Sequence, residues 1–253
     1  MKLKIVKNYY APKIPGIIDP DEKLHCVVWN NCNFRCTYCD FWQRDDIVFK
    51  EISLEQFEIV VRYLVKYGKG FKFTGGEPCL NPQLDAMLRI VKKYDGIVFL
   101  DTNGSLPSRV ASLIDNKLVD IYAISIKGLN KAEALQRSGI TNPKCCWDNV
   151  ITSIQQITER NMTIIATYVI DQSFCYEKLE KYASLLLSLG NTVYLKLNNL
   201  MPNDYNHAMQ PMPYESISVI LQTFIKQYPE FHNRVIYIHE KQAVTNHKQI
   251  RFF

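Results

Sequence analysis

No apolar run in the sequence approaches the roughly 18 residues that a membrane-spanning helix requires. The longest apolar runs, residues 185–187 and 162–170 among them, are far shorter. Residues 1–5 also lack the extended apolar segment and the small-residue cleavage site of a signal peptide. We therefore expect a cytoplasmic protein with no membrane partner.

The sequence also lacks low-complexity segments and clustered charge. Of its 253 residues, 47% are hydrophobic and 22% are charged, which is typical of a globular protein. The lysines and arginines are spread along the chain and leave a formal net charge of +5, so we expect no nucleic-acid partner. The length predicts one domain over residues 1–253, with a core at about 20–202 and a C-terminal helix and arm at 203–253.

Short β-branched segments alternate with stretches of helical periodicity over most of the chain. We predict strands at residues 24–29, 71–74, 97–100, 120–126, 162–170 and 192–197. Helices are predicted at 54–67, 82–94, 148–160, 177–189 and 213–227, and one more helix, after the third strand, is predicted to end near residue 116. A short strand or arm is predicted at 234–239. Six consecutive βα units predict an α/β fold, a partial or complete barrel whose chemistry lies at the carboxyl ends of the strands.

Three of the eight cysteines form a CxxxCxxC motif, Cys32, Cys36 and Cys39, directly after the first predicted strand. Clustered cysteines in a cytosolic chain favour metal or redox chemistry over a disulfide framework. Three thiolates can hold a four-iron cluster and leave one iron open to an outside ligand. A structural zinc site would need four ligands in paired spacings, and the sequence has no second CxxC or HxxxH pair.

Further motifs follow the next three predicted strands. Gly75, Gly76 and Glu77 end the second strand in a Gly-Gly-Glu-Pro segment, Asp-Thr-Asn-Gly at residues 101–104 ends the third, and the fourth runs out to Lys127. Glycines let a backbone approach a ligand closely, and a carboxylate is the natural partner of an ammonium group. A simple turn would explain each glycine segment alone. Their shared position at strand ends, on the same face as the cysteines, favours a ligand site.

This combination of motifs resembles the radical S-adenosylmethionine (SAM) superfamily. The resemblance implies a partial (β/α)6 TIM-like barrel that binds a [4Fe-4S] cluster through Cys32, Cys36 and Cys39. The open iron would chelate SAM, and an electron would split SAM into methionine and a 5'-deoxyadenosyl radical that abstracts a substrate hydrogen. An anaerobic setting and a reducing partner such as a flavodoxin or ferredoxin are expected with this chemistry.

The resemblance also implies which residues contact SAM. Tyr38, in the aromatic position before the third cysteine, would lie near the adenine. The glycines and the glutamate of the Gly-Gly-Glu-Pro segment would face the SAM amino group. The remaining contacts, near the ribose and the carboxylate, would come from Thr102, Asn103, Ser125 and Lys127.

A narrower set of proteins, the activating enzymes of glycyl radical enzymes, has a similar segment 101–104 and a similar strand ending in lysine. This resemblance covers roughly residues 16–202 and implies that the substrate is a glycine in a partner glycyl radical enzyme. Ser125 stands where these activators usually have aspartate, and Ala166 stands where they often have arginine. Both departures motivate the alternative of a stand-alone enzyme that modifies a peptide or a small metabolite by epimerisation, rearrangement or dehydrogenation.

The other cysteines are assigned less specific roles. Cys79 and Cys175 are predicted in loops on the catalytic face and are candidate hydrogen donors for an epimerase. Cys145 and Cys146 are adjacent, which makes them poor chelators of one cluster, so a second cluster is not expected. Cys26, inside the first strand, is expected in the core.

Two possibilities stay open at this stage. Asn198 and Asn199 end the sixth predicted strand and could bind substrate or cap a loop. A non-catalytic iron-sulfur or zinc protein for electron transfer or regulation is a third hypothesis for function, but it would leave the Gly-Gly-Glu-Pro segment without a purpose.

Overall fold

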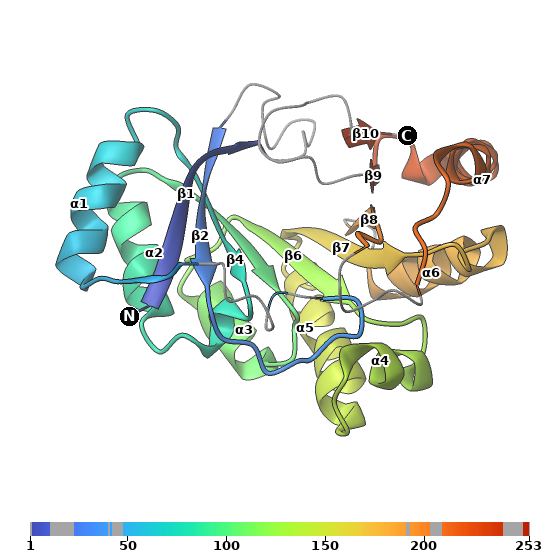
Figure 1. Cartoon of the computed structure of the whole chain (residues 1–253), viewed down its shortest axis with the longest axis horizontal. Helices are drawn as coiled ribbons and strands as arrows, with labels where there is room; N and C mark the ends of the chain where they lie inside the picture. Colours follow the sequence, from blue (N-terminus) through green and yellow to red (C-terminus); the bar gives the residue numbers. More distant parts are fainter. Residues whose placement is uncertain are drawn as a thin grey trace.

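Seven parallel strands form the centre of the computed structural model, which describes residues 2–10, 23–39, 41, 48–190, 193–202, 209–239 and 250–252 (Figure 1). The parallel strands are β2 (Lys23–Trp29), β4 (Gly70–Gly75), β5 (Ile97–Thr102), β6 (Ile121–Ile126), β7 (Thr163–Ile170), β8 (Val193–Asn199) and β9 (Val235–Ile238). They lie side by side in chain order, as expected for successive βα units.

Antiparallel strands extend both edges of this sheet. On one side β1 (Lys2–Tyr10) pairs with β2, and β3 (Lys50–Glu51) pairs with β1. On the other side β10 (Ile250–Phe252) pairs with β9. Within the described residues the sheet ends at β3 and β10 and is therefore open, which fits the predicted partial barrel.

Helices pack against the outer face of the sheet and form an arc around the fanned strands (Figure 1). They are α1 (Leu54–Leu64), α2 (Leu84–Lys93), α3 (Pro107–Asp115), α5 (Asn149–Thr158), α6 (Tyr176–Leu189) and α7 (Tyr214–Gln227). The predicted start of α1 is confirmed, since the Ser53 hydroxyl accepts from Gln56 N and Ser53 N donates to Gln56 Oε1. No described helix is long and apolar enough to cross a membrane.

The inner face of the sheet changes character along the strands. Near the strand beginnings it carries a small apolar cluster of Phe99, Ile121, Ala123, Ile165 and Ile236, with Tyr194 packed against it. Because side chains alternate between the two faces, the next inward positions lie two residues further on. Those positions are polar on β5 to β8: Asp101, Ser125, Thr167 and Lys196. An apolar floor thus closes the barrel below a polar layer.

The predicted strands and helices are confirmed, with boundaries within a few residues. The sequence interpretation missed β1 and the short helix α4 (Lys131–Ser138), which lies between β6 and α5. Local signals for α4 were present, because Asn130 caps it by accepting from Glu133 N and Gly139 ends it in a left-handed conformation. Of the predicted C-terminal arm, residues 203–208, 240–249 and 253 lie outside the described residues.

Candidate active site

A cavity lies where the parallel strands end, in the position that the barrel fold predicts. The predicted cluster ligands Cys32, Cys36 and Cys39 all line it. Its other walls contain most of the predicted SAM contacts: Tyr38, Gly75, Gly76, Thr102, Asn103, Ser125 and Lys127. The cavity is also lined by residues to which the sequence interpretation assigned no role: Phe34, Phe41, Thr74, Asp101, Ala123, Thr167 and Lys196.

The cysteine loop is held in place by the end of helix α4. Arg35 N donates to Ser138 O at 2.9 Å, and Thr37 N donates to Arg137 O at 3.0 Å. Both acceptors are carbonyls of the last helical turn, which have no partner within the helix itself. Gly139 follows with φ 64°, and a Cβ atom there would lie 1.9 Å from Arg35 O. The close approach of α4 to the loop therefore requires glycine at this position.

The Gly-Gly-Glu segment holds the other side of the same loop. Gly76 N donates to Trp29 O at 2.8 Å, and Glu77 N donates to Asn31 O at 2.6 Å. A Cβ atom on Gly76 would lie 2.1 Å from Asn31 O, so any side chain would push the cysteine loop away. Gly75 has φ 108°, a conformation that other residues rarely adopt. These glycines let strand β4 support the loop that carries the cysteines.

Glu77 is fully buried beneath the cavity and is not among its lining residues. Its Oε1 atom accepts from Thr102 Oγ1 at 2.7 Å and from Cys79 N at 2.9 Å, and its Oε2 atom accepts from Asn103 N at 2.6 Å. Burial raises the pKa of Glu77, while these hydrogen bonds act to lower it. Glu77 thus fixes Thr102 and Asn103 on the cavity wall, and its contact with the SAM amino group stays a prediction.

A chain of side-chain hydrogen bonds connects the cysteine loop to the segment after β5. Asn103 Nδ2 donates to Asn33 Oδ1 at 2.8 Å, and Asn33 Nδ2 donates to Ser105 Oγ at 2.9 Å. Ser105 N in turn donates to Asn103 Oδ1 at 2.9 Å. The predicted SAM-contacting segment and the predicted cluster loop therefore form one hydrogen-bonded unit.

Lys127 is a buried cation beside the cysteines. Its Nζ atom donates to Ser125 Oγ at 2.7 Å and lies 5.8 Å from the centre of the Tyr38 ring. Burial alone would lower the pKa of Lys127, but Cys36, Tyr38 and Cys32 outweigh burial and raise this pKa above its usual value. Burial also raises the pKa of Cys32 to about 11. A protein without metal thus keeps the Cys32 thiol protonated, and binding iron has to displace this proton.

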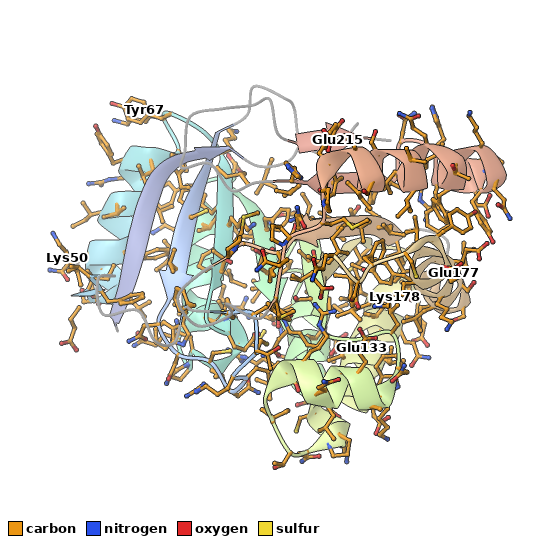
Figure 2. All side chains as sticks on the ribbon, turned by 45° about the vertical axis from the view of Figure 1, so that its right-hand side comes forward. Lys50, Tyr67, Glu133, Glu177, Lys178 and Glu215 are labelled. Carbon is orange, nitrogen blue, oxygen red and sulfur yellow. The ribbon has the colours of Figure 1, made fainter. Side chains whose placement is uncertain are left out.

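Arg137, which the sequence interpretation did not single out, links α4 to strand β7. Its guanidinium lies 5.2 Å from the Tyr38 ring centre and 4.8 Å from the Tyr168 ring centre. It donates to Tyr168 Oη and to Val169 O, both at 2.7 Å. Tyr168 Oη donates to Glu133 Oε1 at 2.5 Å, and Figure 2 labels Glu133 where α4 meets the strands. Arg137 therefore fixes the position of Tyr38 against the barrel.

We expect Arg137→Gln to lower the free energy of unfolding by about 2–3 kcal/mol, because it leaves the buried Tyr168 and the half-buried Glu133 without their cationic partner. The Arg137 side chain is only 11% exposed, so solvent cannot replace the lost contacts. The matched control is Arg160→Gln, since Arg160 pairs with Asp115 on the surface and its loss should change little. Melting temperatures of both variants check this, and equal values would contradict it.

Besides Glu77, two other predicted site residues do not line the cavity. Cys79 is 5% exposed and packs into the main core, because the 3-10 turn Pro78–Leu80 directs its side chain inward. Cys175 stands at the N-cap of α6 and is not a lining residue. Neither residue is among those that line the cavity, and their role as hydrogen donors stays a prediction. Cys146 is buried in a small cluster with Cys36 behind the cysteine loop.

On strand β7 the sequence pattern had drawn attention to Ala166, but this residue faces the helices. Its neighbour Thr167 faces the cavity instead. Asn198 lines the cavity, whereas Asn199 is buried and bonds Met212 through its side chain, as the loop-capping alternative predicted. Asp101 lines the cavity with its Oδ2 atom accepting from Lys72 at 2.8 Å and from Thr74 Oγ1 at 3.0 Å.

The structure is a parallel-stranded barrel with three cysteines in the loop after its first central strand, beside a buried lysine. This arrangement defines an enzyme that holds an iron-sulfur cluster at the carboxyl ends of its strands. The model of the Radical SAM superfamily matches residues 26–210, and the chain belongs to this superfamily. Its cofactors are accordingly a [4Fe-4S] cluster and SAM.

The donor set fits this cluster, since three cysteine thiols line one cavity and a [4Fe-4S] cluster uses thiolate ligands. Within the described residues, no three His, Cys, Asp or Glu side chains stand close enough to share one metal ion. In a four-iron cluster each thiolate binds a different iron, so the three cysteines need not share one metal ion.

Curated relatives of this chain include proteins named as GTP 3',8-cyclases. A probable GTP 3',8-cyclase of Metallosphaera sedula is 29% identical over 140 residues, which cover 54% of this chain and 43% of that protein. One from Pyrobaculum aerophilum is 22% identical over 226 residues, which cover 85% of this chain and 72% of that protein. The Xanthomonas axonopodis pv. citri enzyme is 33% identical over 128 residues, or 47% of this chain and 38% of the enzyme. The chain thus matches less than half the length of the first and third of these proteins.

Solved structures confirm the fold. Streptococcus suis SuiB bound to its precursor peptide SuiA superposes with a TM-score of 0.65 at 16% identity, covering 81% of this chain and 46% of SuiB. The protein anSMEcpe with bound AdoMet gives a TM-score of 0.62 at 20% identity, covering 82% of this chain and 58% of that chain. At these identities the likeness concerns the barrel alone.

Proposed function

We propose that this radical SAM enzyme acts by itself on a small polar substrate, which binds between the SAM side of the cavity and strands β7 and β8. The observation that carries this proposal is the polar wall of Thr167, Lys196 and Asn198, which lies on the inner face of the sheet away from the cysteine loop. The names of the curated relatives, GTP 3',8-cyclase, support a small-molecule substrate.

The residues of the chain have separate tasks in this proposal. The cluster and SAM supply, when bound, the 5'-deoxyadenosyl radical that abstracts a substrate hydrogen. Cys32, Cys36 and Cys39 hold the cluster, and Lys127 keeps a positive charge beside them. Thr102 and Asn103, fixed by Glu77, orient SAM. The barrel and its apolar floor exclude water from the reactive species. We keep a flavodoxin or ferredoxin as the expected electron donor.

Activation of a glycyl radical enzyme is the alternative, supported by segment 101–104 and by Lys127. In that case the hydrogen would come from a glycine of a large protein partner. Peptide modification is supported only by the likeness of the barrel to that of SuiB, which was solved with its precursor peptide bound.

Deuterium transfer into 5'-deoxyadenosine separates these possibilities. The reconstituted protein is given SAM, dithionite and an extract of the native organism grown in deuterated medium, divided into small-molecule and protein fractions. We expect the small-molecule fraction to deliver deuterium, measured by mass spectrometry, and the Cys36→Ala variant to give none. Label that arises only from the protein fraction would overturn the proposal in favour of activation of a protein partner.

A further inference from the structure

Four polar residues form a continuous row across the inner face of the sheet. Ser125 on β6 pairs in register with Thr167 on β7, and Thr167 pairs with Lys196 on β8. Neighbouring strands lie about 5 Å apart, so these side chains are direct neighbours. Asn198 lies two residues beyond Lys196 and therefore on the same face. All four side chains line the cavity.

The fold itself does not require a lysine in this row. One layer below, the inward position of β8 is Tyr194, and that of β7 is Ile165 in the apolar floor. An apolar side chain at position 196 would extend this floor, whereas Lys196 is only 5% exposed and places an ammonium group inside the barrel. The ammonium group of Lys196 therefore belongs to the polar layer that lines the cavity, where a bound ligand can reach it.

Two of the described lysines line the cavity, Lys127 just after β6 and Lys196 on β8. The lining carboxylate of Asp101 is ion-paired with Lys72 at 2.8 Å. Lys127 lies on the side of the cysteine loop, with its Nζ atom 5.8 Å from the centre of the Tyr38 ring. Lys196 lies on β8, which is the fifth strand along the sheet from β2, and β2 leads into the cysteine loop. One lysine of the described cavity wall thus lies near the predicted cluster ligands, and the other lies on a strand far from them in the sheet.

Asn198 provides a second, independent sign of a ligand at this wall. Its Oδ1 atom is buried and has no hydrogen-bond partner among the described residues. A buried carbonyl oxygen without a donor is costly, so this position favours a ligand that brings an N–H or O–H group. Thr167, also buried, offers a hydroxyl group that can donate or accept next to Lys196.

We propose that Lys196 binds a carboxylate or phosphate group of the substrate, with Thr167 and Asn198 supplying hydrogen bonds, so that the reacting carbon of the substrate points toward Ser125 and SAM. This inference rests on the proposed function and adds the chemical class of the substrate: a small anion that also carries a hydrogen-bond donor.

Binding of simple anions tests this inference without turnover. The reconstituted protein is kept oxidised and saturated with SAM, so that SAM occupies its own side of the cavity and is not cleaved. Inorganic phosphate and acetate are then titrated separately by calorimetry. We expect at least one of them to bind, and Lys196→Gln to weaken this binding at least tenfold. The stronger of the two anions distinguishes a phosphate-bearing from a carboxylate-bearing substrate.

Variants with defined outcomes complete the test. Lys196→Arg keeps the charge and should bind the anion within about threefold of wild type. Asn198→Ala should bind it normally but lose affinity for anions that also carry a donor, such as glycolate. The control Lys93→Gln, on the surface of α2, should change nothing. If Lys196→Gln does not fold, the Lys196→Arg and Asn198→Ala variants decide the question.

The inference is overturned if neither anion binds the wild type, or if Lys196→Gln binds as well as the wild type does. These outcomes are independent of the proposed function, which is judged by deuterium transfer into 5'-deoxyadenosine. Deuterium transfer without anion binding would refute the role of Lys196 alone. Anion binding without transfer from small molecules would refute the proposed function alone.

Discussion

The Cys36→Ala variant should lose its cluster and form no 5'-deoxyadenosine from SAM and dithionite. Cys36 is the central cysteine of the CxxxCxxC motif, and its carbonyl oxygen accepts from Cys39 N at 3.0 Å in the turn that presents the third thiol. Two remaining thiolates cannot hold a four-iron cluster in place of three. Iron quantification and chromatographic measurement of 5'-deoxyadenosine report both effects, and the wild type should contain about four iron atoms per chain.

Cys175→Ala is the matched control, because Cys175 lies outside the cavity at the start of α6. It should retain iron and SAM cleavage at wild-type levels. Retention of iron and cleavage by Cys36→Ala would refute the assignment of Cys36 as a cluster ligand. Loss of both properties in Cys175→Ala would show that the protein depends on thiols beyond the three in the motif.

Glu77→Ala should cause the largest loss of stability of any single substitution near the site. The change leaves two backbone N–H groups, of Cys79 and Asn103, and the Thr102 hydroxyl without their acceptor in a fully buried place. Each of these three unpaired buried groups costs about 1–3 kcal/mol, so we expect a total loss of at least about 3 kcal/mol. That is a large part of the roughly 5–15 kcal/mol by which domains are typically stable.

Thermal or urea unfolding of the reconstituted protein measures the loss caused by Glu77→Ala. The free energy of unfolding of Glu77→Gln should lie between those of Glu77→Ala and the wild type. The carbonyl oxygen of the glutamine can still accept a hydrogen bond, while its amide group faces a donor. The control is Glu58→Ala on α1, where Glu58 accepts from Lys93 and Tyr94 at the surface. If Glu77→Ala and Glu58→Ala unfold alike, the positioning role of Glu77 is wrong.

The parts of the site that could be predicted from the sequence are those encoded in contiguous residues. The cysteine motif and the Gly-Gly-Glu segment are local patterns, and their place at strand ends follows from the alternation of strands and helices. Thr167 was missed because a shift of one residue along a strand exchanges the inner and outer faces. Which face Ala166 occupies is decided by packing against the helices, and no local pattern reveals it.

Other differences have equally physical causes. The sequence suggested that the Glu77 carboxylate suits an ammonium group, but it did not reveal that three protein donors surround this carboxylate. Arg137 joins elements far apart in the sequence, so only the folded chain shows its contacts. The narrower resemblance to activators of glycyl radical enzymes rested on short segments, and short segments recur among enzymes with different substrates.

The attachment of the cysteine loop to helix α4 has a consequence for the maturation of the protein. Arg35 and Ser138, whose backbones are hydrogen-bonded, lie 103 positions apart in the chain. During synthesis, the cysteines therefore leave the ribosome long before the helix that fixes their loop exists. Contacts over such sequence distances form late, because the intervening chain must first be ordered. Iron delivered to the nascent chain would meet an unfixed loop, so we expect cluster insertion to follow completion of the first half of the barrel.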